Sequence, residues 1–284
     1  MSNFFLFFLF KNLLFFKNFE ILILNISNKF ELTEGIMKKL MLLIVAVSVP
    51  TFAASGGDLN ASDYVGVSFW LVTAALLAAT AFFFLERSNV SGKWKTSLTV
   101  SGLVTGIALW HYLYMRGVWV ETGTSPTVFR YIDWLLTVPL LIVEFYLILR
   151  AVTNVAASLF WKLFLGSIVM LVFGYLGEAG IMAAWPAFII GCLAWFYMIY
   201  ELWAGEGASA KNASGNAAVM SAYNTMMWII IIGWAVYPLG YFFGYLGGGA
   251  NEGTLNLIYN LADFINKILF GIVIWGAAVS DSHD

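Results

Sequence analysis

Several ionisable side chains lie inside long apolar stretches of this sequence. They are His111, Arg130, Asp133, Glu144, Asp263 and Lys267. An ionisable side chain at the centre of a lipid bilayer costs about 2.5–3.5 kcal/mol on insertion scales, so such residues are candidates for a functional site. Any one of them could instead be a buried polar group that only fixes helix packing, and for His111 both interpretations stay open.

The spacing of these residues suggests a route for protons. Asp263 and Lys267 are four positions apart, so in a helix they share a face about 6 Å apart along the axis. Asp133 and Glu144 also share a face, separated by about 16 Å along the axis. With the orientation argued below, Asp133 lies in the extracellular half of its span, Glu144 in the cytoplasmic half and Lys267 between them. A carboxylate, a nitrogen and a second carboxylate at successive depths are the layout of a proton relay.

Lys267 could also do covalent chemistry. An amine in an apolar setting is a good nucleophile for the carbonyl carbon of a bound compound. A protonated Schiff base formed there needs nearby anions, which Asp133 and Asp263 can supply. Arg130, one turn before Asp133, can balance the excess negative charge.

The composition indicates that membrane helices must position these residues. Hydrophobic residues make up 61% of the 284 residues and charged residues 11%, whereas soluble domains carry about 25% charged residues. An ordinary soluble domain and a disordered chain are therefore excluded. The net charge of -2 argues against nucleic acid as a partner. The single cysteine, Cys192, excludes an internal disulfide framework and a Cys-based metal site, and two histidines argue against a His-built metal site.

Seven apolar stretches are each long enough to cross a bilayer as a helix. Runs such as 229–232, all isoleucine, lack the alternation of barrel strands. Short polar segments, including 205–216, are expected to be connecting loops. The predicted fold is an all-α membrane protein with a bundle of seven transmembrane helices. The expected spans are 64–85, 98–119, 127–149, 155–176, 181–203, 217–246 and 255–279.

The N-terminal part of the chain is not expected to belong to the bundle. Residues 37–54 have a basic start, a short apolar run and a small-residue cleavage site, as a signal peptide does. Residues 1–36 precede that signal, so we interpret Met37 as the physiological start; the alternative is a real amphipathic or poorly ordered extension. The bundle itself is expected within residues 55–284.

Loop cations predict the orientation of the bundle. The side rich in Lys and Arg should be cytoplasmic, and the opposite loops carry little beyond Arg116. An odd number of spans then puts the mature N-terminus outside and the C-terminus in the cytoplasm. A cleaved signal peptide requires the same outside N-terminus. The cations on the basic side are Arg87, Lys93, Lys95, Arg150, Lys162 and Lys211.

Two segments resemble known motifs of the microbial rhodopsins. Residues 261–267, LADFINK, resemble the retinal-attachment motif on the last helix of that family, and residues 130–140, RYIDWLLTVPL, resemble its third helix. The resemblance extends from residue 37 to the C-terminus. Together the motifs are specific, because they place a lysine and two aspartates in the expected spans.

The resemblance implies all-trans-retinal bound to Lys267 as a Schiff base. It makes Asp133 the primary counterion and proton acceptor, and Asp263 the second counterion. It makes Glu144 the donor that returns a proton from the cytoplasmic side, and His111 the partner that tunes the pKa of Asp133.

Three residues match the signature of proton-pumping members of the family, namely Asp133, Thr137 and Glu144. Chloride pumps of the family lack the acceptor carboxylate, and sodium pumps carry Asn and Gln in the signature. Arg130 is expected to provide charge balance. Leu141 resembles the residue of green-absorbing rather than blue-absorbing relatives.

A polyene needs a long apolar slot with aromatic walls. By resemblance Trp134 and Trp234 sandwich the chain of retinal. Pro238 could kink the sixth span or be an ordinary membrane-helix proline. Glu178 could be a solvated loop acid or a group in proton release. The other expected lining residues are Trp195, Tyr237, Pro238 and Tyr259.

The function expected is a light-driven outward proton pump, a multi-pass protein of the bacterial inner membrane and not an enzyme. Its partners would be protons, the lipid bilayer and further copies of the chain, as a pentamer or hexamer by resemblance. A sensory photoreceptor of the same fold is the alternative, against which Glu144 argues. A transporter or ligand-gated receptor with a salt-bridged core is the alternative from another class.

Overall fold

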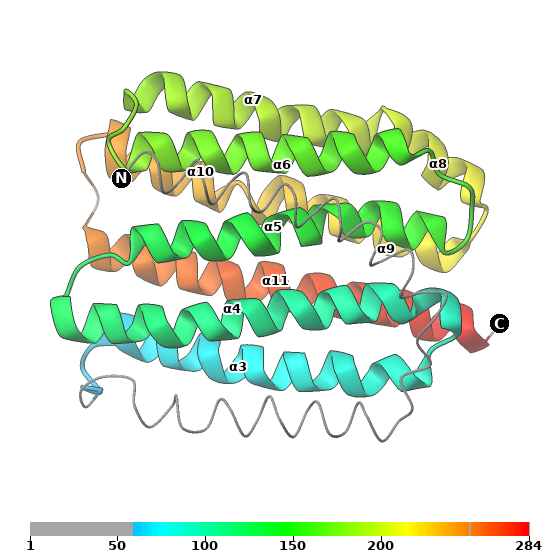
Figure 1. Ribbon diagram of the computed structural model, residues 1–284, viewed down its shortest axis with the longest axis horizontal. Coiled ribbons are helices and arrows are strands. Elements are labelled where there is room, and N and C mark those ends of the chain that lie inside the picture. Colours follow the sequence, from blue (N-terminus) through cyan, green and yellow to red (C-terminus); the bar gives the residue numbers. More distant parts are fainter. Residues whose placement is uncertain (1–58, 250, 284) are drawn as a thin grey trace. The chain divides into compact units, whose positions relative to one another are not determined.

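The computed structural model describes residues 59–249 and 251–283 of the chain, and within these residues the secondary structure is helical (Figure 1). Two 3-10 turns, η1 (Arg87–Asn89) and η2 (Gly92–Trp94), and two π-helical turns, η3 (Ile229–Gly233) and η4 (Phe242–Leu246), interrupt or join the α-helices. The α-helices are α3 (Tyr64–Glu86), α4 (Lys95–Thr122), α5 (Thr127–Arg150), α6 (Ala157–Glu178), α7 (Ala184–Trp203), α8 (Glu206–Ser214), α9 (Ala217–Trp228), α10 (Val236–Tyr241) and α11 (Glu252–His283).

Seven helical segments among the described residues are long and apolar enough to cross a membrane, so the predicted fold is confirmed. The interpretations of residues 1–36 and 37–54 lie outside the described residues. The seven segments are Tyr64–Asn89, Gly92–Thr122, Thr127–Arg150, Ala157–Glu178, Ala184–Ser214, Ala217–Leu246 and Glu252–Ser282.

The helices pack mainly against their neighbours in the chain. Helix α4 lies between α3 and α5, and α6 lies between α5 and α7. The last helix, α11, returns to pack against α3 and α4 and also contacts α5, α9 and α10 (Figure 1). This placement brings the polar residues of α11 against those of α4 and α5.

Local chemistry explains where several helices begin and end. The Asp63 carboxylate caps the start of α3 by accepting from the backbone N–H groups of Val65 and Gly66, at 3.1 and 3.0 Å. The Asn216 side chain caps α9 in the same way. Helix α4 ends at Gly123, whose φ of 65° lies in the left-handed region that favours glycine.

Two expectations from the sequence are corrected. The segment expected to be a loop at 205–216 contains α8, which starts with a glutamate in its first turn and stops at Gly215, with φ of 62°. Its Gly, Ala and Ser content suggested a loop, but Ala and Lys are good helix formers. Arg116, expected in a loop, lies within α4 and is 8% exposed.

The sixth segment is irregular around Pro238. This residue lies in α10, and wide π-helical turns stand on both sides, η3 before it and η4 after it. Gly233, in η3, lets α11 approach closely, because a Cβ there would stand 2.1 Å from Oδ1 of Asn266. The Asn266 amide instead donates to the Gly233 carbonyl at 3.0 Å.

The bundle carries polar side chains inside and large apolar side chains outside. On α7, for example, one helix face carries large apolar side chains that are at least half exposed, namely Ile189, Leu193 and Phe196. Such a surface suits lipid rather than water. The buried polar residues include Arg130, Asp133, Glu144, Asn256, Asn260, Asp263, Asn266 and Lys267.

Candidate functional site

Lys267 lies between two aspartates at the centre of the bundle. Its side chain, on α11, is 2% exposed and forms ion pairs with Asp133 of α5 and Asp263 of α11. Nζ donates a short hydrogen bond to Oδ2 of Asp133 and a second one, of 3.2 Å, to Oδ2 of Asp263. The sequence placed these three side chains together, and their roles in proton transfer remain a prediction.

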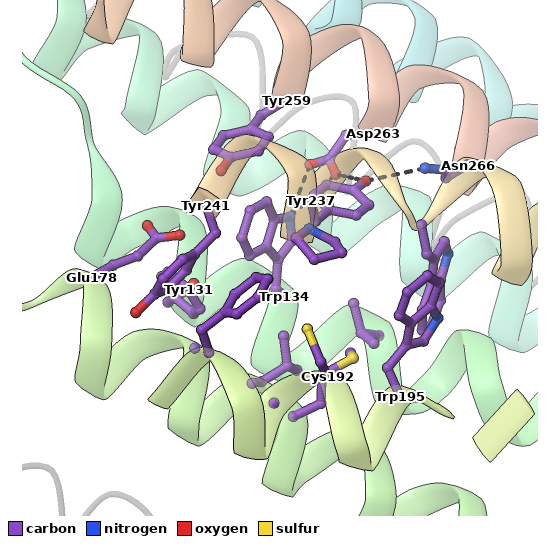
Figure 2. A pocket seen from close by; sticks show the side chains of 18 of the residues that line it. Tyr131, Trp134, Glu178, Cys192, Trp195, Tyr237, Tyr241, Tyr259, Asp263 and Asn266 are labelled. Atoms are coloured by element: carbon purple, nitrogen blue, oxygen red, sulfur yellow. Dashed lines mark hydrogen bonds between the residues drawn. The ribbon is translucent and has the colours of Figure 1, made fainter. Parts of the chain in front are cut away.

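The Asp263 carboxylate is held by several further donors. The Tyr112 and Tyr237 hydroxyls donate to it at 2.8 and 2.6 Å. The indole N–H of Trp134 lies 3.2 Å from both of its oxygens (Figure 2). A carboxylate with so many donors is stabilised as the anion.

The Asp133 carboxylate has fewer hydrogen-bond donors around it than the Asp263 carboxylate has. Its Oδ1 is buried and has no hydrogen-bond partner among the described residues. The Thr137 hydroxyl donates to the backbone carbonyl of Asp133, at 2.9 Å, and not to its carboxylate. His111 is half-buried and interacts electrostatically with Asp133 and Lys267, without a hydrogen bond to Oδ1. Asp133 therefore has an oxygen open to receive a proton.

Arg130 is buried one turn before Asp133. Its Nη2 donates to the amide oxygens of Asn256 and Asn260, at 2.8 and 2.9 Å, and Nη1 lies 3.4 Å from the Tyr112 hydroxyl. Within the described part of the chain the guanidinium makes no ion pair with either aspartate. It acts on them across the Tyr112 hydroxyl and through space.

Glu144 is alone in an apolar part of the bundle. It is 1% exposed, and neither carboxylate oxygen completes a hydrogen bond with a described residue, although the Ser97 hydroxyl of α4 faces it. The next residue, Phe145, makes edge contacts with Tyr223 and Phe270, at 4.9 and 5.8 Å between ring centroids. A buried carboxyl group without a cation partner is suited to hold a proton.

An apolar pocket, part of whose lining is shown in Figure 2, has Lys267 among its lining residues. It has about 820 Å³ of space between its side chains, open space at its mouth included. Trp134 is at its centre, with ring contacts to Tyr237 and Tyr259 at 5.0 and 5.5 Å. All the pocket residues predicted from the sequence line it, namely Trp134, Leu141, Trp195, Trp234, Tyr237, Pro238 and Tyr259.

Glu178 also lines the pocket, so its interpretation as a solvated loop acid is wrong. It is the last residue of α6, half-buried, and lies within hydrogen-bonding reach of Tyr131 and Tyr245. Figure 2 places it near Tyr131 and Tyr241, at the opposite side of the view from Trp195. Cys192, of α7, is a further lining residue.

Several neutral polar residues of the site were not predicted from the sequence. Tyr112 bridges Arg130 and Asp263, and Asn266 donates to the Tyr237 hydroxyl at 3.3 Å. A signal was present on α11, where polar residues recur at a helical spacing and form one stripe. The residues of that stripe are Asn256, Asn260, Asp263 and Lys267.

Comparison with known proteins identifies the family. The sequence model of the family described as "Bacteriorhodopsin-like protein" matches residues 63–280. The chain belongs to this family and is a multi-pass membrane protein with the seven-helix fold of the microbial rhodopsins, as the two sequence motifs predict.

Within the family the chain is similar to the proteorhodopsins. It is 76% identical to the green-light absorbing proteorhodopsin of Gamma-proteobacterium EBAC31A08, over 87% of this chain and 100% of that one. The crystal structure of blue light-absorbing proteorhodopsin from Med12 shares 56% identity and a TM-score of 0.68, covering 77% of this chain and 99% of that one. The structure of xanthorhodopsin, a light-driven ion pump with a dual chromophore, shares 26% identity and a TM-score of 0.69, covering 79% and 96%.

Proposed function

We propose that this chain is a light-driven proton pump that binds all-trans-retinal at Lys267 and moves protons outward across the bacterial inner membrane. One observation carries the proposal. A buried lysine stands at an aromatic pocket, between an aspartate with an open oxygen and an aspartate with many donors. A salt-bridged transporter or receptor core would not need the apolar, aromatic pocket that adjoins the lysine.

The residues of the pocket fit retinal. Its walls are apolar and aromatic, which suits a polyene, and the lysine amine is the group that a retinal aldehyde would require for a Schiff base. Trp134 and Trp234 would line the chain, and Leu141 would adjust the colour. When bound, retinal supplies the absorption of visible light and the isomerisation that drives the cycle.

The protein's own groups then move the proton. Asp133 accepts the proton held at Nζ of Lys267, because its Oδ1 is open. Asp263 stays ionised and keeps the site neutral, because its donors stabilise the anion. Glu144 returns a proton to the nitrogen from the other side, since it is buried and holds no cation. His111 adjusts the readiness of Asp133 to accept.

The direction of transport follows from the orientation in the membrane. If the side rich in Lys and Arg is cytoplasmic, Glu144 faces the cytoplasm and Asp133 faces outward. One cycle then moves one proton out and stores about 2.3 kcal/mol per 100 mV of membrane potential. Further copies of the chain, as a pentamer or hexamer, are expected to surround it in the bilayer.

A sensory photoreceptor is the second candidate within the fold. Such a protein needs a long-lived signalling intermediate, whereas a buried carboxyl such as Glu144 would shorten its lifetime by returning the proton quickly. The buried position of Glu144 on α5 therefore favours the pump.

The experiment is to express the chain with all-trans-retinal in cells and to illuminate them. We expect a visible pigment and acidification of an unbuffered medium, reversible with a protonophore. Lys267→Ala should abolish both. A pigment that forms but moves no protons would contradict the pump and support the photoreceptor, and no pigment at all would contradict both.

A further inference from the structure

The inner surface of α11 holds two buried asparagines beside Arg130. Asn256 and Asn260 are one turn apart, and both are 0% exposed. Each directs its amide oxygen at Nη2 of Arg130, at 2.8 and 2.9 Å. Two acceptors on one guanidinium nitrogen form a specific clamp.

A second hydrogen bond fixes the direction of each amide. The amide nitrogen of Asn256 donates to the Glu252 carbonyl at 2.9 Å, and that of Asn260 donates to the Ser68 hydroxyl at 2.9 Å. A guanidinium can only donate hydrogen bonds, so each amide must present its oxygen to Arg130, and the bond from its nitrogen holds it in that orientation.

The other contacts of Arg130 are weaker. Nη1 lies 3.4 Å from the Tyr112 hydroxyl, and Nε is buried without a partner among the described residues. The guanidinium also lies over aromatic rings, at 5.5 Å from the centroid of Phe69 and 5.7 Å from that of Tyr259. Such contacts stabilise a cation but set its position loosely.

The chemical type of the two clamp residues matters as much as their position. A carboxylate in the same place would cancel the charge of Arg130, because it would form an ion pair. An amide oxygen holds the guanidinium in place and leaves its full positive charge to act on the aspartates beyond Tyr112.

We propose that Asn256 and Asn260 are positioning residues for Arg130, which hold its guanidinium back from the aspartates and leave Oδ1 of Asp133 open to receive a proton. This rests on the proposed function, since only a pump or photoreceptor of this type moves a proton to Asp133. Without the clamp the guanidinium swings toward that open oxygen, which is a buried acceptor without a hydrogen-bond partner among the described residues.

The test is an acid titration of the pigment's colour, which reports protonation of the counterion aspartates. In the double variant Asn256→Leu, Asn260→Leu, Arg130 loses both acceptors and moves toward Asp133, so the midpoint of the colour change falls. In Asn260→Asp the clamp remains but the positive charge is cancelled, so the midpoint rises by about one pH unit for unit charges about 10 Å apart.

Other groups around Arg130 and the counterions are unchanged in these variants, so they do not produce opposite shifts. On α4 they are His111 and Tyr112, on α6 Glu178, on η4 Tyr245, on α5 Tyr131, and on α11 Glu252, Tyr259 and Lys267.

Ser68→Ala is the matched control, because it removes a partner of Asn260 and leaves both acceptors of Arg130 in place. Its midpoint should stay near that of the wild type. If both Asn variants titrate like the wild type, the inference is wrong, whereas absence of light-driven transport in the wild type would overturn the proposed function instead. If the Leu double variant forms no pigment, the single variant Asn256→Leu still removes one acceptor of Arg130; a lower midpoint then supports the clamp, and an unchanged midpoint contradicts it.

Discussion

The two ends of the route around Lys267 are built in opposite ways. On one side, Arg130, Tyr112, Asn256, Asn260 and Asp263 form a continuous hydrogen-bond network, which we call the polar half. On the other side, which we call the dry half, Glu144 and Ser97 lie among apolar and aromatic side chains, with Phe145, Tyr223 and Phe270 packed edge to face.

The contrast indicates how each half handles a proton. In the polar half, the groups of the network already lie within hydrogen-bond distance of their neighbours, so a shift of charge along it needs little movement. In the dry half, neither oxygen of Glu144 has a hydrogen-bond partner among the described residues. If Glu144 is the donor, as proposed, delivery of its proton to Lys267 requires a rearrangement or the entry of water, which would separate the two sides of the membrane between turnovers.

Asp133→Asn should have the largest effect, because it removes the proposed acceptor of the proton held at Lys267. We expect a pigment with a shifted absorption maximum and no net light-driven proton transport, measured as the change in pH of an illuminated cell suspension. Asp281→Asn, at the distant end of α11, is the control and should pump like the wild type. Transport by the Asp133 variant would show that another group accepts the proton.

Glu144→Gln should have the next largest effect, confined to the second half of the cycle. Removing a positioned proton donor slows transfer by about 10²–10⁴-fold, so recovery of the resting pigment after a flash should slow accordingly. The proton must then come from bulk water, so the recovery rate should fall about tenfold for each unit of rising pH. A recovery rate independent of pH in this variant would contradict the assignment of Glu144 as donor.

Gly233→Ala should have a moderate effect on stability, because it separates the sixth and seventh segments where they approach most closely. The added Cβ would stand 2.1 Å from Asn266 Oδ1 and displace an amide that donates to Gly233 and Tyr237. Loss of buried hydrogen bonds costs about 1–3 kcal/mol, which thermal bleaching of the pigment would report. Gly276→Ala is the control, since a Cβ there meets no atom within 4 Å.

Glu206→Gln should have the smallest effect. Its exposed carboxylate pairs with Lys162 at 2.9 Å, and Lys162 keeps a second partner in Glu201 at 2.8 Å. Exposed ion pairs contribute little to stability, so neither thermal bleaching nor the recovery rate should change measurably. Slow recovery in this variant would mean that the dry half depends on the junction of α7 and α8.

The sequence predicted the parts of the molecule that carry charge or long apolar runs. Lys267, Asp133 and Asp263 were placed together because charge inside a span must be paired. Asn256 and Asn260 were missed because a neutral amide in a membrane helix is tolerated more easily and attracts less notice. Helix α8 was missed because its polar composition resembles that of a loop, and its packing against α7 cannot be deduced from composition.

The place of His111 shows a different limit. Its depth in the second span could be predicted, but whether its ring bonds to Asp133 depends on a side-chain orientation that spacing does not determine. In this structure the two groups interact electrostatically, while Oδ1 of Asp133 has no hydrogen-bond partner in the part of the chain that the structure describes.

The contact between Gly233 and Asn266 has an optical consequence. Gly233 immediately precedes Trp234 in the pocket wall, and Asn266 immediately precedes Lys267. Any force that squeezes or spreads this crossing moves the wall and the attachment nitrogen relative to each other. The absorption maximum of the pigment should therefore depend on how closely the two backbones approach each other. Hydrostatic pressure or a thicker bilayer should shift that maximum.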